Sequence, residues 1–226
     1  GRGTYSVKDF ENFSFNELDS LSNIYSVTYY TDLYGVYSDD WIEEYRPYLS
    51  KKDLNAQGGV NRIYGGFTNN DLLFLKMMKQ KERLIIAEFN ILPASQSQEI
   101  RTTFENEFNV HWTGWVGRYF DNLDTLVNKE LPRWIIKNYK AANCGTWPFK
   151  NSGIVFVNGD IVVILENNIH LDFEVPLIRT KKKFQKRYSI TPEIKYPVWF
   201  EIVELKQQNS AISNHHIMIT HKGDSL

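Results

Sequence analysis

Polar and aromatic residues are predicted to gather at one edge of a β-sheet, where four strands in the first half of the chain end. In an open α/β sheet, ligands bind outside the carboxyl ends of the strands. Carboxylate, amide, hydroxyl and aromatic groups at this edge, which we call the rim, could bind a polar ligand by hydrogen bonding and stacking. The residues predicted at the rim are Asp32, Tyr34, Tyr64, Gly65, Gly66, Glu88, Asn90, Trp115 and Arg118.

Glu88 is the rim residue that could act as an acid or a base. It interrupts an apolar run just before a turn, and a carboxylate is costly to bury unless it is paired. Arg118 is a candidate partner for it. Two interpretations stay open: Glu88 is a general acid–base or ligand-anchoring residue, or it forms a structural ion pair that holds its loop.

Other reaction types lack the residues that they need. The chain contains no G-x-S-x-G, P-loop, G-x-G-x-x-G or H-E-x-x-H motif. The single cysteine, Cys144, follows a predicted helix, whose C-terminal end favours the thiol over the reactive thiolate. His215 and His216 alternate between the faces of a predicted strand, so both cannot easily reach one ion. We therefore expect no metal, no cofactor, and no cysteine or serine nucleophile.

The elements that would position the rim alternate between strand and helix. Strands are predicted over 24–30, 62–64, 83–89 and 110–116. Ser14 and Thr68 are predicted to cap helices, and the apolar run of the third strand is typical of burial on both faces. This order predicts right-handed βαβ units in a three-layer α/β sheet that is mostly parallel.

The last part of the chain predicts antiparallel β structure. Asn158-Gly159 lies between two β-prone runs and indicates a hairpin. The basic cluster over 181–187 is expected in a solvated loop, with an anionic partner or a membrane surface as the alternative. The predicted organisation is a lead-in over 1–23, an α/β domain over 24–170, and a β-rich extension over 171–226 that further polypeptide is expected to follow.

Composition narrows the classes of partner. The chain has 226 residues, 42% of them hydrophobic, which is enough for a sizeable core. With a net charge of −1, the chain lacks the surplus of basic residues that a nucleic-acid binder needs. The chain begins Gly1-Arg2-Gly3 without methionine. We therefore expect that a signal peptide or membrane anchor was removed, with a processed or internal fragment as the alternative, and favour an extracytoplasmic or membrane-anchored location over a cytoplasmic one.

Three segments resemble a group of uncharacterised bacterial proteins that look like relatives of the class I glutamine amidotransferase-like superfamily. These segments are Ile63-Tyr64-Gly65-Gly66-Phe67-Thr68, Ile86-Ala87-Glu88-Phe89-Asn90 and the run from Trp112 to Phe120. The resemblance covers about residues 24–166 and implies a flavodoxin-like sheet with a nucleophile on the turn after a central strand.

The nucleophile that the superfamily carries in G-x-C-x-G is missing. The corresponding turn is Ala87-Glu88-Phe89-Asn90, and His170-Leu171-Asp172 departs from the later His-x-Glu pair. The resemblance therefore argues for the fold and against glutamine hydrolysis.

Two functional hypotheses from different classes follow. The first is a non-catalytic amidotransferase-like domain of a bacterial envelope protein, which binds a small polar ligand, a glycan or a protein at the rim. The alternative is a hydrolase or transferase that uses Glu88 as acid or base, with Asp32 or His111 nearby and Arg118 as the anion anchor. A third interpretation takes the aromatic residues of the rim as a buried interface.

Overall fold

The computed structural model describes residues 10–33, 35–37, 62–172, 175–206, 209–217 and 219. The chain divides into two compact units, Gly1–Phe108 and Asn109–Leu226, which we call the N-terminal and C-terminal units. Their boundary falls inside the α/β domain predicted over 24–170. No helix in the described part of the chain is long and apolar enough to cross a membrane.

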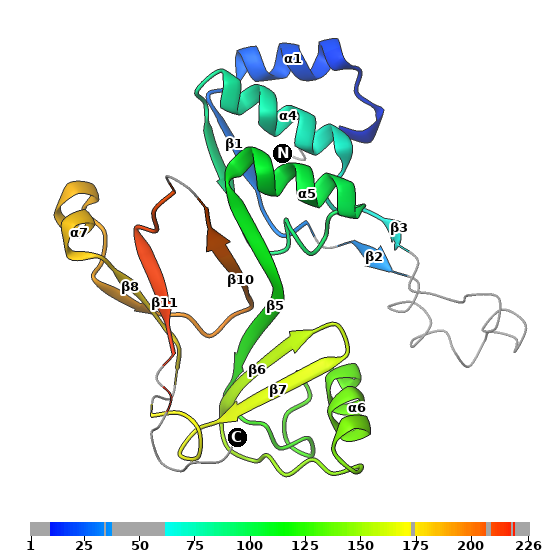
Figure 1. The fold of residues 1–226 in the computed structure, drawn as a ribbon, viewed down its shortest axis with the longest axis vertical. Coiled ribbons are helices and arrows are strands. Elements are labelled where there is room, and N and C mark those ends of the chain that lie inside the picture. The colour runs from blue at the N-terminus through cyan, green and yellow to red at the C-terminus, as the bar shows by residue number, and fades with distance from the viewer. Residues whose placement is uncertain are drawn as a thin grey trace, which may run out of the picture. The chain divides into compact units, whose positions relative to one another are not determined.

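The N-terminal unit places helices against a short parallel sheet (Figure 1). Its elements are η1 (Phe10–Asn12), α1 (Phe15–Ile24), β1 (Val27–Tyr30), β2 (Val36–Tyr37), β3 (Arg62–Tyr64), α4 (Asn69–Gln80), β4 (Leu84–Ala87) and α5 (Gln98–Phe108). Strand β1 pairs in parallel with β4, whereas β2 pairs with β3 in antiparallel orientation. The chain from β3 through α4 to β4 returns the polypeptide to the side of β1.

Both predicted helix caps in this unit are confirmed. Ser14 and Glu17 form a reciprocal capping box at the start of α1, and Thr68 and Asp71 form another at the start of α4. Each box satisfies amide groups that have no partner within the helix. Helix α4 then buries its apolar side chains, namely Leu72, Phe74, Leu75, Met77 and Met78.

Only one face of the β1–β4 pair is covered by the described helices. Tyr30 is buried and reaches α4, whereas Tyr29 points to the opposite face and is 55% exposed. In β4, Leu84 and Ile86 are also exposed. The prediction that this strand is buried on both faces is therefore wrong for the described residues, because an apolar run does not reveal how many layers cover it.

The C-terminal unit is mainly antiparallel. Its elements are β5 (Val110–Phe120), α6 (Arg133–Ala142), β6 (Gly153–Asn158), β7 (Ile161–Glu166), β8 (Leu177–Thr180), α7 (Lys182–Tyr188), β9 (Glu193–Lys195), β10 (Phe200–Leu205) and β11 (Ser213–His216). One sheet has the order β10-β5-β6-β7 and the other β11-β8-β9. The predicted hairpin is confirmed, because β6 and β7 pair around Asn158 and Gly159.

The prediction of a mostly parallel sheet needs correction. The chain is α/β, but β5 pairs antiparallel with both β6 and β10, so the strand predicted over 110–116 joins the hairpin sheet. Strand β5 spans 11 residues, longer than predicted, which gives it enough backbone to pair with the hairpin that follows. A helix, α7, replaces most of the loop predicted for the basic cluster.

The larger of two hydrophobic clusters in the described part of the C-terminal unit lies around β6 and α6. It contains Phe120, Leu123, Leu131, Ile135, Phe149, Val155, Val157 and Ile164. Gly153 permits close packing at its edge, because a Cβ there would lie 2.5 Å from the carbonyl oxygen of Leu165 and 2.8 Å from Leu123. The hairpin turn differs, because Gly159 has open space around it and a φ of +57°.

We predict that Gly153→Ala destabilises the protein by about 1–3 kcal/mol, because backbone or core side chains must shift to admit the methyl group. Gly159→Ala is the control, and it should cost only the backbone strain of a positive φ, about 1 kcal/mol. Urea unfolding of both variants checks this order. A larger loss of stability in Gly159→Ala than in Gly153→Ala would contradict the packing described for β6 and β7.

Candidate functional site

The loops that follow β1 and β4 meet at the rim. Because these parallel strands are neighbours, their carboxyl ends lie side by side. Asp32 follows β1 and Asn90 follows β4, and the Asn90 Nδ2 group donates a hydrogen bond of 2.7 Å to Oδ1 of Asp32. Asn90 is buried, whereas Asp32 is exposed. The structure thus joins two of the predicted rim residues directly.

The conformation of Asn90 shows why this residue can occupy the turn. Its φ of +71° lies in the left-handed region, which asparagine tolerates better than most residues. Its carbonyl oxygen accepts a hydrogen bond from the N–H of Ala94, which closes the turn after β4. The backbone of Asn90 therefore closes the loop after β4, while its side chain binds Asp32 in the loop after β1.

The turn after β3 lies beside the same loop. Gly65 and Gly66 both have positive φ, of 77° and 83°, a succession that glycine adopts without strain. Phe67 follows, donates from its N–H to the Ala94 carbonyl, and accepts at its own carbonyl from the N–H of Gln96. The predicted glycine turn and the Asn90 loop thus share one edge of the N-terminal unit.

Glu88 lies at this edge but is exposed. Its N–H donates to the Tyr30 carbonyl and extends the β1–β4 ladder. The hydroxyl of Tyr29 hydrogen-bonds to the Glu88 side chain, and this bond is the main reason why the pKa of Tyr29 is raised. Glu88 and Tyr29 therefore form a second polar pair at the rim, on the sheet face opposite α4.

The buried carboxylate of Asp71 links the start of α4 to the end of β1, next to the rim. Asp71 accepts hydrogen bonds from the N–H and hydroxyl of Thr68, at 2.9 and 2.7 Å, and from the Tyr30 hydroxyl, at 3.2 Å. Burial raises the pKa of Asp71, although these hydrogen bonds lower it, and burial likewise raises the pKa of Tyr30. This role of Asp71 was not predicted, although the spacing of Thr68 and Asp71 after a Gly-Gly turn is a detectable capping signal.

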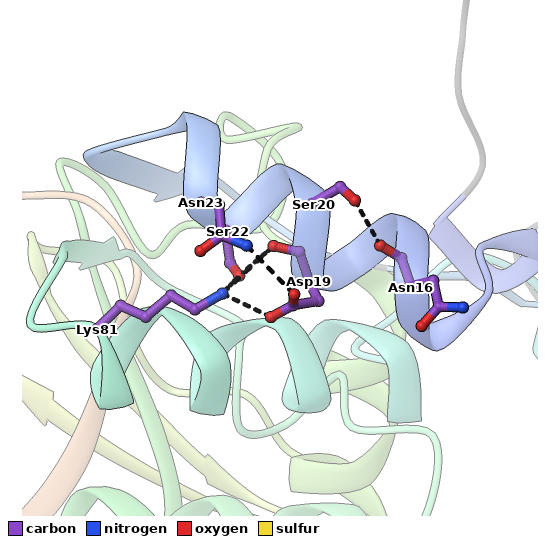
Figure 2. Close-up of polar contacts among 6 residues, drawn as sticks. All are labelled: Asn16, Asp19, Ser20, Ser22, Asn23 and Lys81. Carbon is purple, nitrogen blue, oxygen red and sulfur yellow. Dashed lines mark hydrogen bonds and ion pairs between the residues drawn. The ribbon is translucent and has the colours of Figure 1, made fainter.

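A serine–lysine contact joins α1 to the end of α4 (Figure 2). Lys81 Nζ contacts Ser22 Oγ and lies 2.6 Å from Asp19 Oδ1. Serine and lysine can form a catalytic dyad, but Ser22 is fully buried and donates to the Asp19 carbonyl. The hydrogen bond from Lys81 lowers the pKa of Asp19. We therefore assign the cluster to fastening α1, not to catalysis.

Trp115 and Arg118 belong to the C-terminal unit, on β5. The partner expected for Arg118 is Glu88, but its guanidinium pairs with Glu130 at 2.8 Å. It also stacks over Phe120 and Trp199, with distances of 4.7 and 5.8 Å to the ring centroids. These contacts hold the Arg118 side chain within the C-terminal unit.

The other residues singled out in the sequence are not brought into the rim by the described structure. Tyr34 lies outside the described residues, as does the side chain of Tyr64, whose backbone belongs to β3. Nδ1 of His170 accepts a hydrogen bond from the N–H of Glu166, within a tight turn. Cys144 is exposed. Within the described ranges, no group of three or more His, Cys, Asp or Glu residues could hold a metal ion.

Comparison of the chain with family models, curated proteins and solved structures finds no match. The site is therefore interpreted from its own geometry.

We predict that Asp71→Asn changes the pH dependence of stability. The raised pKa means that the folded state holds the Asp71 proton more tightly than the unfolded state, whose ordinary value is 3.8. The stability contributed by this group is therefore present below about pH 4 and is lost as the pH rises through the folded pKa. The asparagine amide can accept from Thr68 and donate to Tyr30 at every pH.

Urea unfolding of wild type and Asp71→Asn between pH 4 and 7 measures the effect. Wild type should lose stability relative to the variant as the pH rises. Asp71→Ala is the matched variant, and it should cost about 1–3 kcal/mol because it strands the Thr68 amide. A pH-independent difference between wild type and Asp71→Asn would show that the Asp71 pKa is not raised by folding.

Proposed function

We propose that this chain is a non-catalytic binding protein whose N-terminal unit recognises a polar ligand rich in hydroxyl groups, such as a glycan, at the rim. The observation that carries the proposal is the hydrogen bond between Asn90 and Asp32 across the carboxyl ends of β1 and β4. Ligand sites in α/β proteins use this edge. We further propose a flavodoxin-like, amidotransferase-like origin for the N-terminal unit, and a place for the protein in the bacterial envelope.

The chemistry of the rim supports a hydroxyl-rich ligand. Carboxylates accept hydrogen bonds, and amides both donate and accept them, which suits the alternating donors and acceptors of neighbouring sugar hydroxyls. The exposed ring of Tyr29 offers an apolar surface beside these groups. The two carboxylates of Asp32 and Glu88 also disfavour an anionic ligand, because like charges repel.

The turn after β4 supports binding over catalysis. In the amidotransferase-like pattern, this turn would carry the nucleophile. Here Asn90 holds the positive φ of the turn, and its side-chain amide is not a nucleophile. The alternative, a hydrolase or transferase that uses Glu88, draws support from the exposure of Glu88 and its hydrogen bond with Tyr29. Arg118, its proposed anion anchor, is paired with Glu130.

A thermal-shift screen with mono- and oligosaccharides tests the proposal. A ligand that binds only the folded state stabilises it by about 2.7 kcal/mol at a hundredfold excess over its Kd. Asp32→Ala and Asn90→Gly should abolish the shift. Glycine keeps the positive φ at position 90 and removes only the amide. Asp160→Ala, which removes an exposed carboxylate from the C-terminal unit, should keep the shift.

Two outcomes decide against the proposal. If Asp32→Ala and Asn90→Gly respond to the same sugars as wild type, the rim is not the binding site. If wild type converts a bound sugar to a product and Glu88→Gln abolishes that conversion while binding persists, the enzyme hypothesis replaces the binding hypothesis.

A further inference from the structure

Helix α7 is rich in basic residues and lies at the surface of the C-terminal unit. Four of its residues and its N-cap, Lys181, are cationic, in the sequence Lys181-Lys182-Lys183-Phe184-Gln185-Lys186-Arg187, and no residue of the helix is fully buried. The full chain has 26 basic and 27 acidic residues. Outside this cluster it therefore keeps 21 basic against 27 acidic residues, so positive charge is concentrated here.

The described residues place no acidic side chain against these cations. The carboxylate of Glu193, on β9, pairs instead with Arg179 of β8, at 2.6 Å. The only contacts shown for the charged groups of α7 are with aromatic rings. Lys183 lies over Phe184, at 4.7 Å, and Arg187 lies over Tyr188, at 5.3 Å. The cluster thus keeps its charge for an external anion.

The helix is nevertheless held in place. Gln185 donates from Nε2 to the Thr180 carbonyl, at 2.8 Å. Thr180 is buried, and its hydroxyl contacts the Thr191 carbonyl and Ser213 Oγ, both at 2.9 Å. The N–H of Lys181 donates to the Ile212 carbonyl. Hydrogen bonds with β8, with β11 and with the residues just before β9 and β11 therefore hold α7, which follows β8 directly (Figure 1).

Apolar side chains accompany the cations. Phe184 and Tyr188 are stacked one turn apart, with ring centroids 5.8 Å apart. They share one side of the helix, because residues four apart lie above each other. Tyr188 is 47% exposed, and Ile190, just after the helix, is 38% exposed. An exposed aliphatic side chain gains nothing from a phosphate backbone but gains from insertion into lipid.

We propose that α7 and Ile190 form a docking surface for an anionic membrane. The cations would lie among the lipid headgroups, with Tyr188 and Ile190 reaching the boundary with the acyl chains. Each Lys or Arg near such a surface strengthens binding severalfold, and the attraction fades within a Debye length of about 8 Å. A cluster of cations on one short helix can therefore bind an anionic surface although the chain as a whole has a net charge of −1.

Co-sedimentation with vesicles tests this surface. Wild type should bind vesicles of 70% phosphatidylcholine and 30% phosphatidylserine, and should not bind vesicles of phosphatidylcholine alone. The triple variant Lys182→Gln, Lys183→Gln and Lys186→Gln should lose about a hundredfold in partition coefficient. Glutamine is as good a helix former as lysine, so thermal melting should be unchanged. Ile190→Ser should weaken binding severalfold while leaving the charge intact.

The matched control removes three cations from another helix of the same unit, through Arg133→Gln, Lys137→Gln and Lys140→Gln on α6. This variant should bind like wild type. Equal losses in both triple variants would mean that only net charge matters and would overturn the proposal. So would binding of a fluorescent 20-nucleotide single strand that depends on α7 in the absence of vesicle binding, which would assign the surface to nucleic acid.

Discussion

The buried carboxylate of Asp71 is the interaction on which the N-terminal unit depends. It connects two parts of the chain that are 41 residues apart in sequence: the end of β1, through Tyr30, and the capped first turn of α4, through Thr68. A buried carboxylate is tolerated only where hydrogen bonds replace its lost water. The position of α4 against β1 is therefore specified by hydrogen-bond geometry as well as by apolar packing.

The placement of α4 against β1 also determines which loops meet at the rim. Because α4 is fixed against β1, the strand that follows it, β4, pairs in register with β1 from Val27 with Leu84 to Tyr30 with Ala87. That register brings the loops after both strands to one edge, where Asn90 can reach Asp32. The Lys81–Asp19 ion pair fastens α1 at the other end of α4 (Figure 2). Polar contacts therefore hold both ends of α4, through Asp71 at its start and Lys81 at its end, and α4 in turn positions the strands that carry the rim.

Local signals in the sequence were sufficient for the parts of the fold that depend on neighbouring residues. The caps at Ser14 and Thr68 and the hairpin at Asn158-Gly159 are confirmed because their geometry is set within a few residues. Strand pairing is not set in that way. The apolar and aromatic pattern of β5 suits either a parallel or an antiparallel neighbour, and only tertiary structure decides between them. The pairing expected between Arg118 and Glu88 is likewise a long-range contact, and Arg118 pairs instead with Glu130, 12 residues away in sequence.

The residues of the candidate site likewise divide into those that were predicted from the sequence and those whose roles depend on long-range contacts. Asp32, Gly65, Gly66 and Asn90 were placed together by the rule that ligands bind at the carboxyl ends of parallel strands, and the N-terminal unit contains one such parallel pair. Asp71 and Tyr29 were missed, because their roles depend on contacts 41 residues apart in one case and across the β1–β4 pair in the other. The basic helix α7 was expected as a loop, since its cations hide the helical spacing of Phe184 and Tyr188.

A double-mutant cycle between Asp32 and Asn90 tests the central claim most directly. The unfolding free energies of wild type, Asp32→Ala, Asn90→Gly and the double variant give the coupling between the two side chains. The hydrogen bond across the carboxyl ends of β1 and β4 predicts a coupling of about 1 kcal/mol. Losses that simply add would mean that the two loops do not meet through these side chains, and the rim would lose the pair on which its proposed binding depends.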